Sequence, residues 1–234
     1  VYAVGRLNPG TADFGDTLIS DTIASFYIVK YDSAGLFQWL RTIGVRNIGW
    51  TGAPAYVAAD DSGNVYMAGT FSDFLYAGDD TLTGEKTGMM GRPFLAKYAA
   101  DGTYRWVRTP GMNSIDADYF TRALEISPDG YVYFMGKCNT TFFPWCDTLV
   151  FENDTVWYSS FTAKYDAGGN VVWANGFSAY LAFDKTGHYY TARQAATKTR
   201  LSKFNAGDSL IWWFDLGGVP KDMGVDSIGN IYLT

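Results

Sequence analysis

Two cysteines offer the most definite covalent chemistry in this 234-residue sequence. Cys138 and Cys146 are the only cysteines of the chain, and both fall in one expected loop. We expect them to form a disulfide, which is typical of proteins in oxidising, extracytoplasmic surroundings. Closing such a loop stabilises a fold by roughly 2.5 kcal/mol in the chain-entropy model. Two unpaired thiols are the alternative, and a metal site has less support because the chain has no second cysteine pair.

Histidine and carboxylate chemistry has weaker support. The single histidine, His188, occupies a turn position that Asn64 and Asn230 hold elsewhere, so neither a catalytic triad nor a multi-histidine metal site is indicated. Asp116 and Asp118 could give two oxygen ligands to Ca²⁺, but the glycine and distal glutamate of a dedicated calcium loop are absent. They remain a weak metal candidate, and we expect no cofactor. Paired carboxylates for glycoside cleavage stay open, because spacing in sequence does not set their separation in space.

Aromatic residues that the rest of the chain does not repeat are the candidates for binding. Phe142, Phe143 and Trp145 lie between the two cysteines. Exposed rings on a constrained loop lose little entropy when they bind a partner, so we predict that they contact a protein or a glycan. The alternative is that they fold back over their own sheet. Trp50 and Trp157 are unrepeated too and are weaker candidates of the same kind.

The tripeptide Asp-Thr-Leu occurs three times and places a threonine at Thr17, Thr81 and Thr148. Asp-Thr pairs commonly form turns. The tripeptide also resembles the Asp-Ser/Thr-apolar acceptor of O-glycosylation in Bacteroidetes, which would mark these three threonines for modification. The sequence favours neither interpretation over the other.

The elements that carry these residues follow an internal repeat. In each of four units a lysine is followed nine residues later by a tryptophan; the pairs are Lys30/Trp39, Lys97/Trp106, Lys164/Trp173 and Lys203/Trp212. A tyrosine preceded by a Gly-x-x element recurs at Tyr66, Tyr133, Tyr190 and Tyr232, and Tyr2 joins this series. We expect the rings to be buried between sheets. We expect the lysine stems to lie along neighbouring rings, with the ammonium groups satisfied at the sheet edges.

Each unit is expected to form short antiparallel strands. In the third unit these are 121–127, 131–137, 161–166 and 171–176, where apolar residues alternate and Asp/Asn/Ser-x-x-Gly turns intervene. Four-stranded units whose tyrosines lie 57 to 67 residues apart predict an all-β fold, a β-propeller of four-stranded antiparallel blades. The blades are expected near 1–50, 51–112, 113–177 and 178–219, with the start of a further blade at 220–234.

Residues 1–234 are therefore interpreted as one incomplete propeller domain with about four blades. The chain begins within the second strand of one unit and ends within the second strand of another. We expect further blades, and other domains, in a longer protein.

Composition excludes two kinds of partner. The formal net charge is −6 and the isoelectric point about 4.7, so a nucleic acid would be repelled on average. No stretch approaches the roughly 18 consecutive apolar residues that a membrane-spanning helix requires, so we expect no membrane insertion.

Two segments carry a resemblance to a known family. Asp61-Ser62-Gly63-Asn64-Val65-Tyr66-Met67-Ala68-Gly69-Thr70 and the run from Phe161 to Trp173 resemble the SBBP repeat, the bacterial seven-bladed β-propeller family. The resemblance implies a secreted or surface-exposed bacterial protein, of the kind found in Bacteroidetes with a type IX secretion signal, and a larger propeller of up to seven blades. It supplies no catalytic residues. Unit four departs from the pattern, because Asp208 replaces the turn glycine and the unit lacks Asp-Thr-Leu.

The expected function is a non-catalytic propeller module, extracellular or on a bacterial cell surface. It would bind a protein or a glycan, or act as a scaffold, through loops at one rim. One alternative is a propeller lyase or hydrolase with its active site at the channel mouth. Another is a structural spacer or a cargo of type IX secretion.

Overall fold

The computed structural model describes residues 1–15, 17–47, 55–84, 91–112, 118–138, 148–157, 160–176, 180–195, 197–226 and 228–234. Within these ranges the regular structure consists of 23 β-strands, every paired strand is antiparallel, and there is no helix. A membrane-spanning helix is accordingly not found among these residues. The predicted all-β fold is confirmed, and the strands divide among several open sheets.

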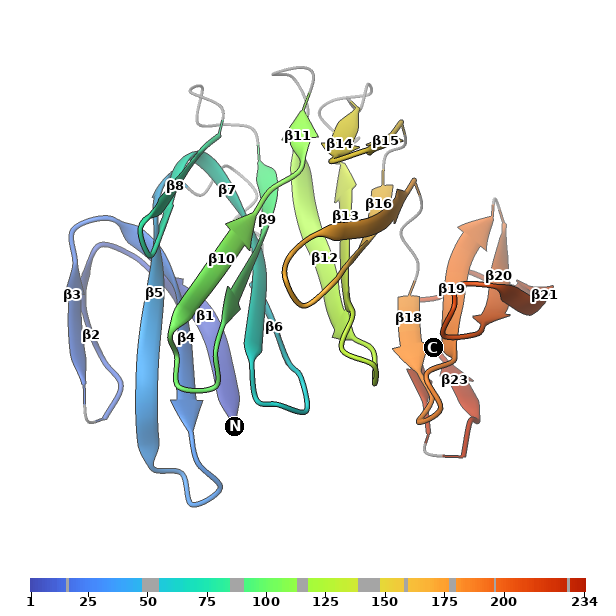
Figure 1. Cartoon of the computed structure of the whole chain (residues 1–234), viewed down its shortest axis with the longest axis horizontal. Coiled ribbons are helices and arrows are strands. Elements are labelled where there is room, and N and C mark those ends of the chain that lie inside the picture. Colours follow the sequence, from blue (N-terminus) through green and yellow to red (C-terminus); the bar gives the residue numbers. More distant parts are fainter. Residues whose placement is uncertain are drawn as a thin grey trace.

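Units one and two share an eight-stranded sheet, because one long strand belongs to both. Unit one contains β1 (Tyr2–Leu7), β4 (Ala24–Tyr31) and β5 (Phe37–Asn47). Unit two contains β6 (Tyr56–Ala59), β7 (Val65–Ala77), β9 (Arg92–Tyr98) and β10 (Tyr104–Arg108). The first half of β7 pairs with β6 and β9, and its second half pairs with β5 and β8 (Asp80–Thr83). These strands form the left half of Figure 1.

Units three and four are separate four-stranded sheets. Unit three contains β12 (Tyr119–Ile126), β13 (Val132–Cys138), β16 (Ser160–Tyr165) and β17 (Val171–Asn175). Unit four contains β18 (Tyr180–Phe183), β19 (Tyr189–Ala195), β20 (Lys198–Phe204) and β21 (Leu210–Gly217). A final hairpin follows, made of β22 (Met223–Val225) and β23 (Ile231–Leu233). Figure 1 shows the units side by side in chain order.

Short hairpins at one end of the sheets tie consecutive units together through backbone pairing. The end of β5 pairs with the second half of β7, where Gly44 lies opposite Tyr76. One unit later, β11 (Gly111–Met112) pairs with β14 (Leu149–Phe151), which forms a hairpin with β15 (Asp154–Val156). The segment that follows the last strand of a unit is thus bound to the hairpin of the next unit. Unit one has its own hairpin, of β2 (Gly10–Asp13) and β3 (Leu18–Asp21).

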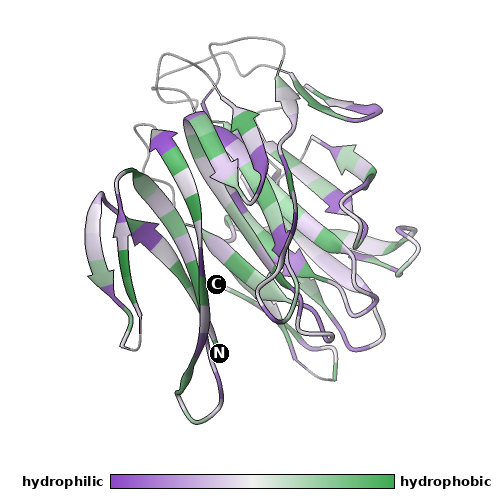
Figure 2. Cartoon of the chain, turned by 60° about the vertical axis from the view of Figure 1, so that its left-hand side comes forward, coloured by the Kyte–Doolittle hydropathy of each residue, from purple (hydrophilic) through white to green (hydrophobic). Residues whose placement is uncertain are grey.

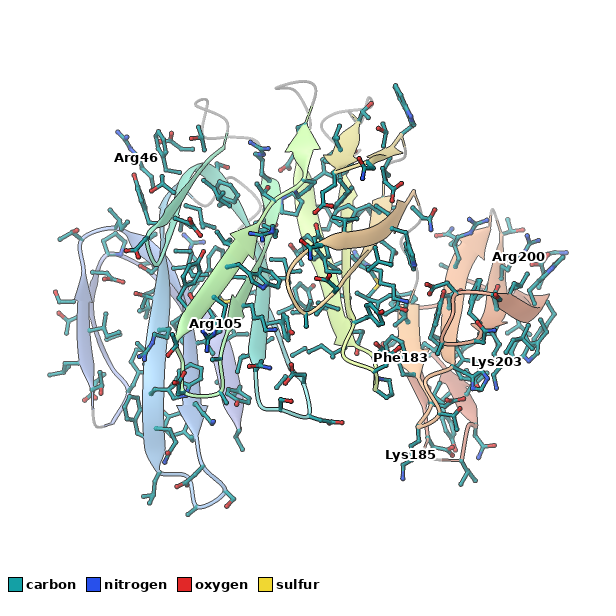
Figure 3. All side chains as sticks on the ribbon, viewed as in Figure 1. Arg46, Arg105, Phe183, Lys185, Arg200 and Lys203 are labelled. Atoms are coloured by element: carbon teal, nitrogen blue, oxygen red, sulfur yellow. The ribbon has the colours of Figure 1, made fainter. Side chains whose placement is uncertain are left out.

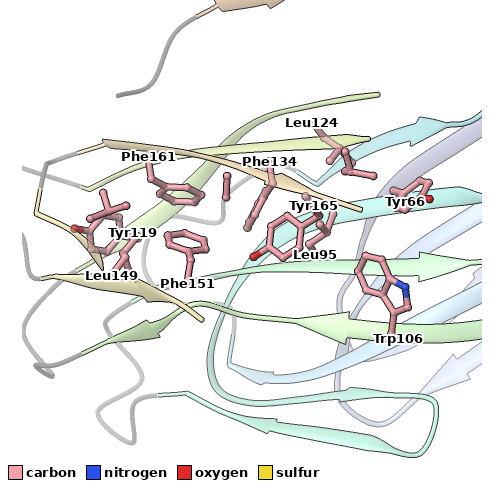
Figure 4. Close-up of a cluster of buried hydrophobic side chains, with 14 of the residues drawn as sticks. Tyr66, Leu95, Trp106, Tyr119, Leu124, Phe134, Leu149, Phe151, Phe161 and Tyr165 are labelled. Atoms are coloured by element: carbon pink, nitrogen blue, oxygen red, sulfur yellow. The ribbon is translucent and has the colours of Figure 1, made fainter. Parts of the chain in front are cut away.

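Hydrophobic side chains fill the space between neighbouring sheets. Tyr66 and Leu95 of unit two pack with Leu124, Phe134 and Phe161 of unit three in one buried cluster, which Figure 4 shows. A second cluster joins units one and two, and a third joins units three and four. In Figure 2 hydrophobic bands occur along the strands and alternate with more hydrophilic ones. The inner units therefore bury both faces of their sheets.

The repeated tyrosine, lysine and tryptophan stand in one row across three adjacent strands. In unit three, Tyr133 of β13 lies opposite Lys164 of β16, which lies opposite Trp173 of β17. The same register recurs as Tyr2–Lys30–Trp39, Tyr66–Lys97–Trp106 and Tyr190–Lys203–Trp212. Each lysine Nζ lies 5.0 to 5.5 Å from the centroid of its tyrosine ring. The prediction that the lysine stems lie along neighbouring rings is confirmed, and the nine-residue spacing follows from the hairpin register.

The rows of units one, two and three each end on an oxygen atom of the next unit, and we call this contact a joint. Lys30 Nζ and Trp39 Nε1 both donate to the carbonyl oxygen of Ala100, at 2.9 and 3.1 Å. In the next joint, Lys97 Nζ and Trp106 Nε1 donate to the carbonyl of Ala167, at 2.7 and 3.4 Å. Both acceptors lie in the turn between the last two strands of the following unit. The joint therefore fixes how far one sheet is displaced along the next.

The joint between units three and four uses a carboxylate instead. Lys164 Nζ donates to Asp208 Oδ2 at 2.8 Å, and Trp173 Nε1 donates to the same oxygen at 3.0 Å. Asp208 stands where units two and three have a turn glycine, and it adopts a φ of 64°. Its other oxygen accepts from the hydroxyl groups of Tyr133 and Tyr189, at 3.4 and 3.2 Å.

Glycine at these turns is required by space as well as by φ. Gly169 has a φ of 84°, and a Cβ added there would lie 2.9 Å from the ring of Trp106 in the preceding unit. Gly35 has a similar φ of 79°, but no atom would lie within 4 Å of its Cβ. A side chain at Gly35 would therefore cause backbone strain alone, whereas one at Gly169 would cause both backbone strain and a clash with the neighbouring sheet.

We expect Gly169→Ala to lower the free energy of unfolding by about 2–4 kcal/mol, because strain in the left-handed region adds to overpacking against a buried ring. Gly35→Ala, the matched control, should cost only about 1–2 kcal/mol, because strain acts alone. Urea unfolding of both variants measures the difference. Equal losses in the two variants would contradict the role assigned to the joint.

Candidate functional site

A pocket of about 1000 Å³ opens where the turns of units two, three and four meet. Its walls come from the turns after β6, β12 and β18 and from the turn between β16 and β17. The lining carboxylates are Asp60, Asp61, Asp129, Asp166 and Asp184, and the lining cation is Lys185. Figure 3 labels Phe183 and Lys185, which follow one another closely at the end of β18. The pocket thus combines an acidic rim with apolar walls.

Three of these carboxylates are held by their own turns. Asp60 Oδ1 accepts hydrogen bonds from the backbone N–H groups of Ser62 and Asn64, and its Oδ2 accepts from the Asn64 side chain at 2.8 Å. Asp166 and Asp184 accept the same two backbone bonds in their turns. Short polar side chains commonly stabilise turns in this way. These carboxylates are therefore fixed in position relative to the pocket.

Hydrogen bonding keeps two of them ionised. Burial acts to raise the pKa of Asp166, but bonds from Asn170 and from the Gly168 backbone outweigh it and lower the pKa below its usual value. Burial likewise acts to raise the pKa of Asp184, and bonds led by those from Thr186 lower it. At neutral pH the pocket carries negative charge.

The two remaining carboxylates, Asp61 and Asp129, are solvent-exposed and do not accept the paired backbone bonds that hold the turns. Asp129 accepts a hydrogen bond from Ser127 Oγ. Both side chains belong to turns of fixed geometry, with Gly63 and Gly130 at φ values of 77° and 85°. Their charges can therefore face a partner without loss of the turn.

Aromatic rings of the third joint form the apolar wall. Lys164 Nζ lies 4.3 Å from the ring centroid of Tyr131, which lines the pocket. Phe183 lines it too, and its ring centroid lies 5.1 Å from that of Tyr133. Because these rings pack on the joint between units three and four, the joint positions the wall.

Most of the aromatic residues predicted to bind lie outside the described residues, namely Phe142, Phe143, Trp145 and Trp50. Trp157, directly after β15, is described and is 74% exposed. Figure 1 places β15 and the β12–β13 turn at opposite ends of unit three, so Trp157 and the pocket are separate surfaces. Its role in binding stays a prediction.

The other predicted site residues also fall into described and undescribed groups. Cys138 is fully buried at the end of β13, and Cys146 lies outside the described residues, so the disulfide stays a prediction. Asp118 is 3% exposed and accepts a hydrogen bond from Gly91 N at 2.8 Å, and Asp116 is not described. In the described ranges no three histidine, cysteine or acidic side chains are grouped to hold a metal ion.

The three predicted acceptor threonines occupy different environments. Thr81 lies on β8 and is exposed, Thr17 precedes β3 and is partly buried, and Thr148 precedes β14 and is only 6% exposed. They stand at different places in their hairpins, so the same tripeptide has different surroundings in each unit. Thr81 is the most accessible of the three to a modifying enzyme, and the modification stays a prediction.

No family model matches this sequence, and no curated protein matches it. Among solved structures, a protein of unknown function from Bacteroides caccae is similar over 89% of this chain, with 13% sequence identity and a TM-score of 0.44. The chain spans 60% of the length of that protein.

Glu125 has a shifted pKa that the sequence did not reveal. It lies on β12 opposite Tyr133, and its side chain reaches solvent. Desolvation by the surrounding protein raises the pKa of Glu125 to about 7, and the negative charge of Asp222 adds to the rise. Neither cause is local in sequence, since Asp222 immediately precedes β22.

The raised pKa predicts a pH dependence of stability. The folded state binds a proton more tightly than the unfolded state does, so Glu125 lowers the free energy of unfolding as pH rises from about 4.5 to about 7. We expect Glu125→Gln to stabilise the protein at pH 8 relative to its effect at pH 5. Asp222→Asn should act in the same direction but less strongly. Chemical unfolding at the two pH values measures both, and a pH-independent effect of Glu125→Gln would refute the prediction.

Proposed function

We propose that this chain is part of a bacterial β-propeller of the SBBP repeat type that binds a protein partner through the acidic pocket, without catalysis. The supporting observation is the joint, which sets units two, three and four in one register and brings their turns together. Each sheet then acts as a rigid support for exposed turn residues. Rigid scaffolds that present variable loops are a common design for recognition.

The chemistry of the pocket indicates the class of partner. Five carboxylates and one lysine line it, so it favours a cationic group. Tyr131 and Phe183 offer apolar surface beside those charges. An arginine or lysine side chain, with its apolar stem and charged head, meets both requirements. We therefore propose a basic segment of a protein as the ligand.

The proposed location is extracellular or at the bacterial cell surface. The expected Cys138–Cys146 disulfide and the resemblance to the SBBP repeat support it. Trp157 supports a second contact on the opposite rim, because an exposed indole of this kind suits a glycan or a protein.

The proposal predicts that Asp61→Asn/Asp129→Asn weakens binding of a fluorescein-labelled hexa-arginine peptide, measured by anisotropy at 0.15 M salt. We expect a loss of about fivefold or more, because each exposed ion pair contributes up to about 1 kcal/mol. Asp79→Asn/Asp101→Asn is the matched control, because it removes the same charge from two exposed turn positions outside the pocket.

Equal losses in the two double variants would mean that the peptide senses only net charge, and would refute the pocket as the site. Binding of a glycan that Trp157→Ala abolishes, with no peptide binding to the parent chain, would move recognition to the opposite rim.

A further inference from the structure

The outer face of unit four has the same row of side chains as the other units but lacks their acceptor. Trp212 lies opposite Lys203, and Lys203 lies opposite Tyr190. Among the residues that the structure describes, the indole N–H of Trp212 has no hydrogen-bond acceptor. Of the described carboxylates and carbonyls, Lys203 Nζ reaches Asp184 of its own unit alone, at 3.7 Å. We refer to Tyr190, Lys203, Trp212 and Phe214 as the unit-four face.

This face is partly open to solvent, in contrast to the occupied joints. The Lys203 side chain is 22% exposed, whereas that of Lys164 is 3% exposed. Phe214, whose ring stacks on Trp212 at 5.3 Å, is 46% exposed. Figure 3 labels Lys203 in unit four, on the side away from unit three. Solvent therefore takes the place at this face of the oxygen acceptor that the occupied joints supply to the lysine and the indole N–H.

The inner part of the face is covered already. Strand β22 packs against β18, and a Cβ added to Gly229 would lie 3.8 Å from the Tyr190 hydroxyl. At the first joint, the hydroxyl of Tyr2 reaches the carbonyl of Gly63 in the corresponding turn. The hairpin β22–β23 therefore occupies the place of the first two strands of a unit. The acceptor turn of the third and fourth strands is what the face lacks.

We propose that the unit-four face is a docking surface for a β-hairpin supplied by a further repeat unit. This hairpin consists of the third and fourth strands of that unit, as β9 and β10 do in unit two. Its first strand pairs with β23, which pairs only with β22 among the described strands. Its turn then lies over Trp212 and Lys203. A carbonyl or carboxylate oxygen in that turn accepts from both donors, as Ala167 and Asp208 do at the occupied joints.

A second copy of this chain fits the face less well. The hairpin of the second copy with an unoccupied turn is β4–β5, since Gly35 has open space around its Cβ position. That hairpin is already bordered by β1, which pairs along β4 from Tyr2 to Leu7. If the β4–β5 hairpin of a second copy docked on the unit-four face, β1 of that copy would occupy the position that β23 of the first copy already fills. A hairpin with a free edge meets no such obstruction.

The test extends the chain by one hairpin. Strand β19 ends at Ala195 and β20 begins at Lys198, so a copy of residues 196–217 can follow Thr234 with an equally short connection. We expect the extended chain to melt about 5–10 °C above the parent chain, as a few kcal/mol of added stability would produce in a protein of this size. A scrambled segment of the same composition is the control.

Lys203→Met distinguishes docking from nonspecific stabilisation. It should remove about half or more of the rise in the extended chain and change the parent chain by less than about 2 °C, because only the extended chain gives Lys203 its turn acceptor. Lys137→Met, an exposed cation outside both the face and the pocket, should leave the rise intact. A rise that Lys203→Met does not alter, or none above the scrambled control, would overturn the proposal.

Self-association is the remaining outcome that would refute the hairpin as occupant. Light scattering would then detect dimers of the parent chain that Lys203→Met and Trp212→Ala dissociate. None of these measurements uses the pocket or its peptide, so the proposed function and this inference can fail separately.

Discussion

The lysine ammonium groups enclosed between the sheets must find oxygen acceptors, and this requirement governs how the sheets stand against one another. Burying an unpaired ammonium group is far more costly than the stability of a typical domain can absorb. Desolvation lowers the pKa of Lys97, which is the direct sign of that cost. The bond to Ala167 at 2.7 Å offsets it. Because the acceptor belongs to the next unit, the hydrogen bond forms in only one relative position of the two sheets. Hydrophobic contacts are non-directional and would by themselves allow one sheet to shift along the other.

The third joint shows that the acceptor can change while the requirement stays. Asp208 places a carboxylate where the other joints use a carbonyl, and it adopts a left-handed φ of 64° that is unfavourable for a residue with a side chain. In return it forms an ion pair with the almost fully buried Lys164. Desolvation first, and then the charge of Asp208, raise the pKa of Tyr133, so its hydroxyl keeps the proton that it donates. One substitution in the repeat thus gathers four donors on one side chain.

The sequence predicted this framework because the framework is local and repeated. The nine-residue interval between lysine and tryptophan places them opposite one another in a hairpin, and the turns with glycine at positive φ form where they were expected. The short connection of unit four was also expected from its missing segment, since β20 begins directly after β19. Each of these features depends on residues fewer than about ten positions apart.

The remaining features depend on contacts between units, which the spacing of residues does not encode. The sequence showed Asp208 as a lost glycine, and its role as an acceptor for Lys164 is visible only when units three and four are placed together. The repeated Asp-Thr-Leu tripeptide likewise does not fix the surroundings of its threonine, because Thr81 is exposed on β8 and Thr148 is buried before β14. The desolvation of Glu125 depends on neighbours far along the chain.

The acidic pocket likewise depends on local turn structure and on contacts between units. Several of these turns use a carboxylate to hold their backbone N–H groups, so units two, three and four each contribute negative charge at the same end of the sheets. The joints then bring those ends together. Asp60, Asp166 and Asp184 are committed to their turns, which leaves Asp61 and Asp129 as positions where side chains can change without loss of the scaffold. Under the proposed function, specificity for the partner can change at these two positions while the residues that hold the sheets in register stay the same.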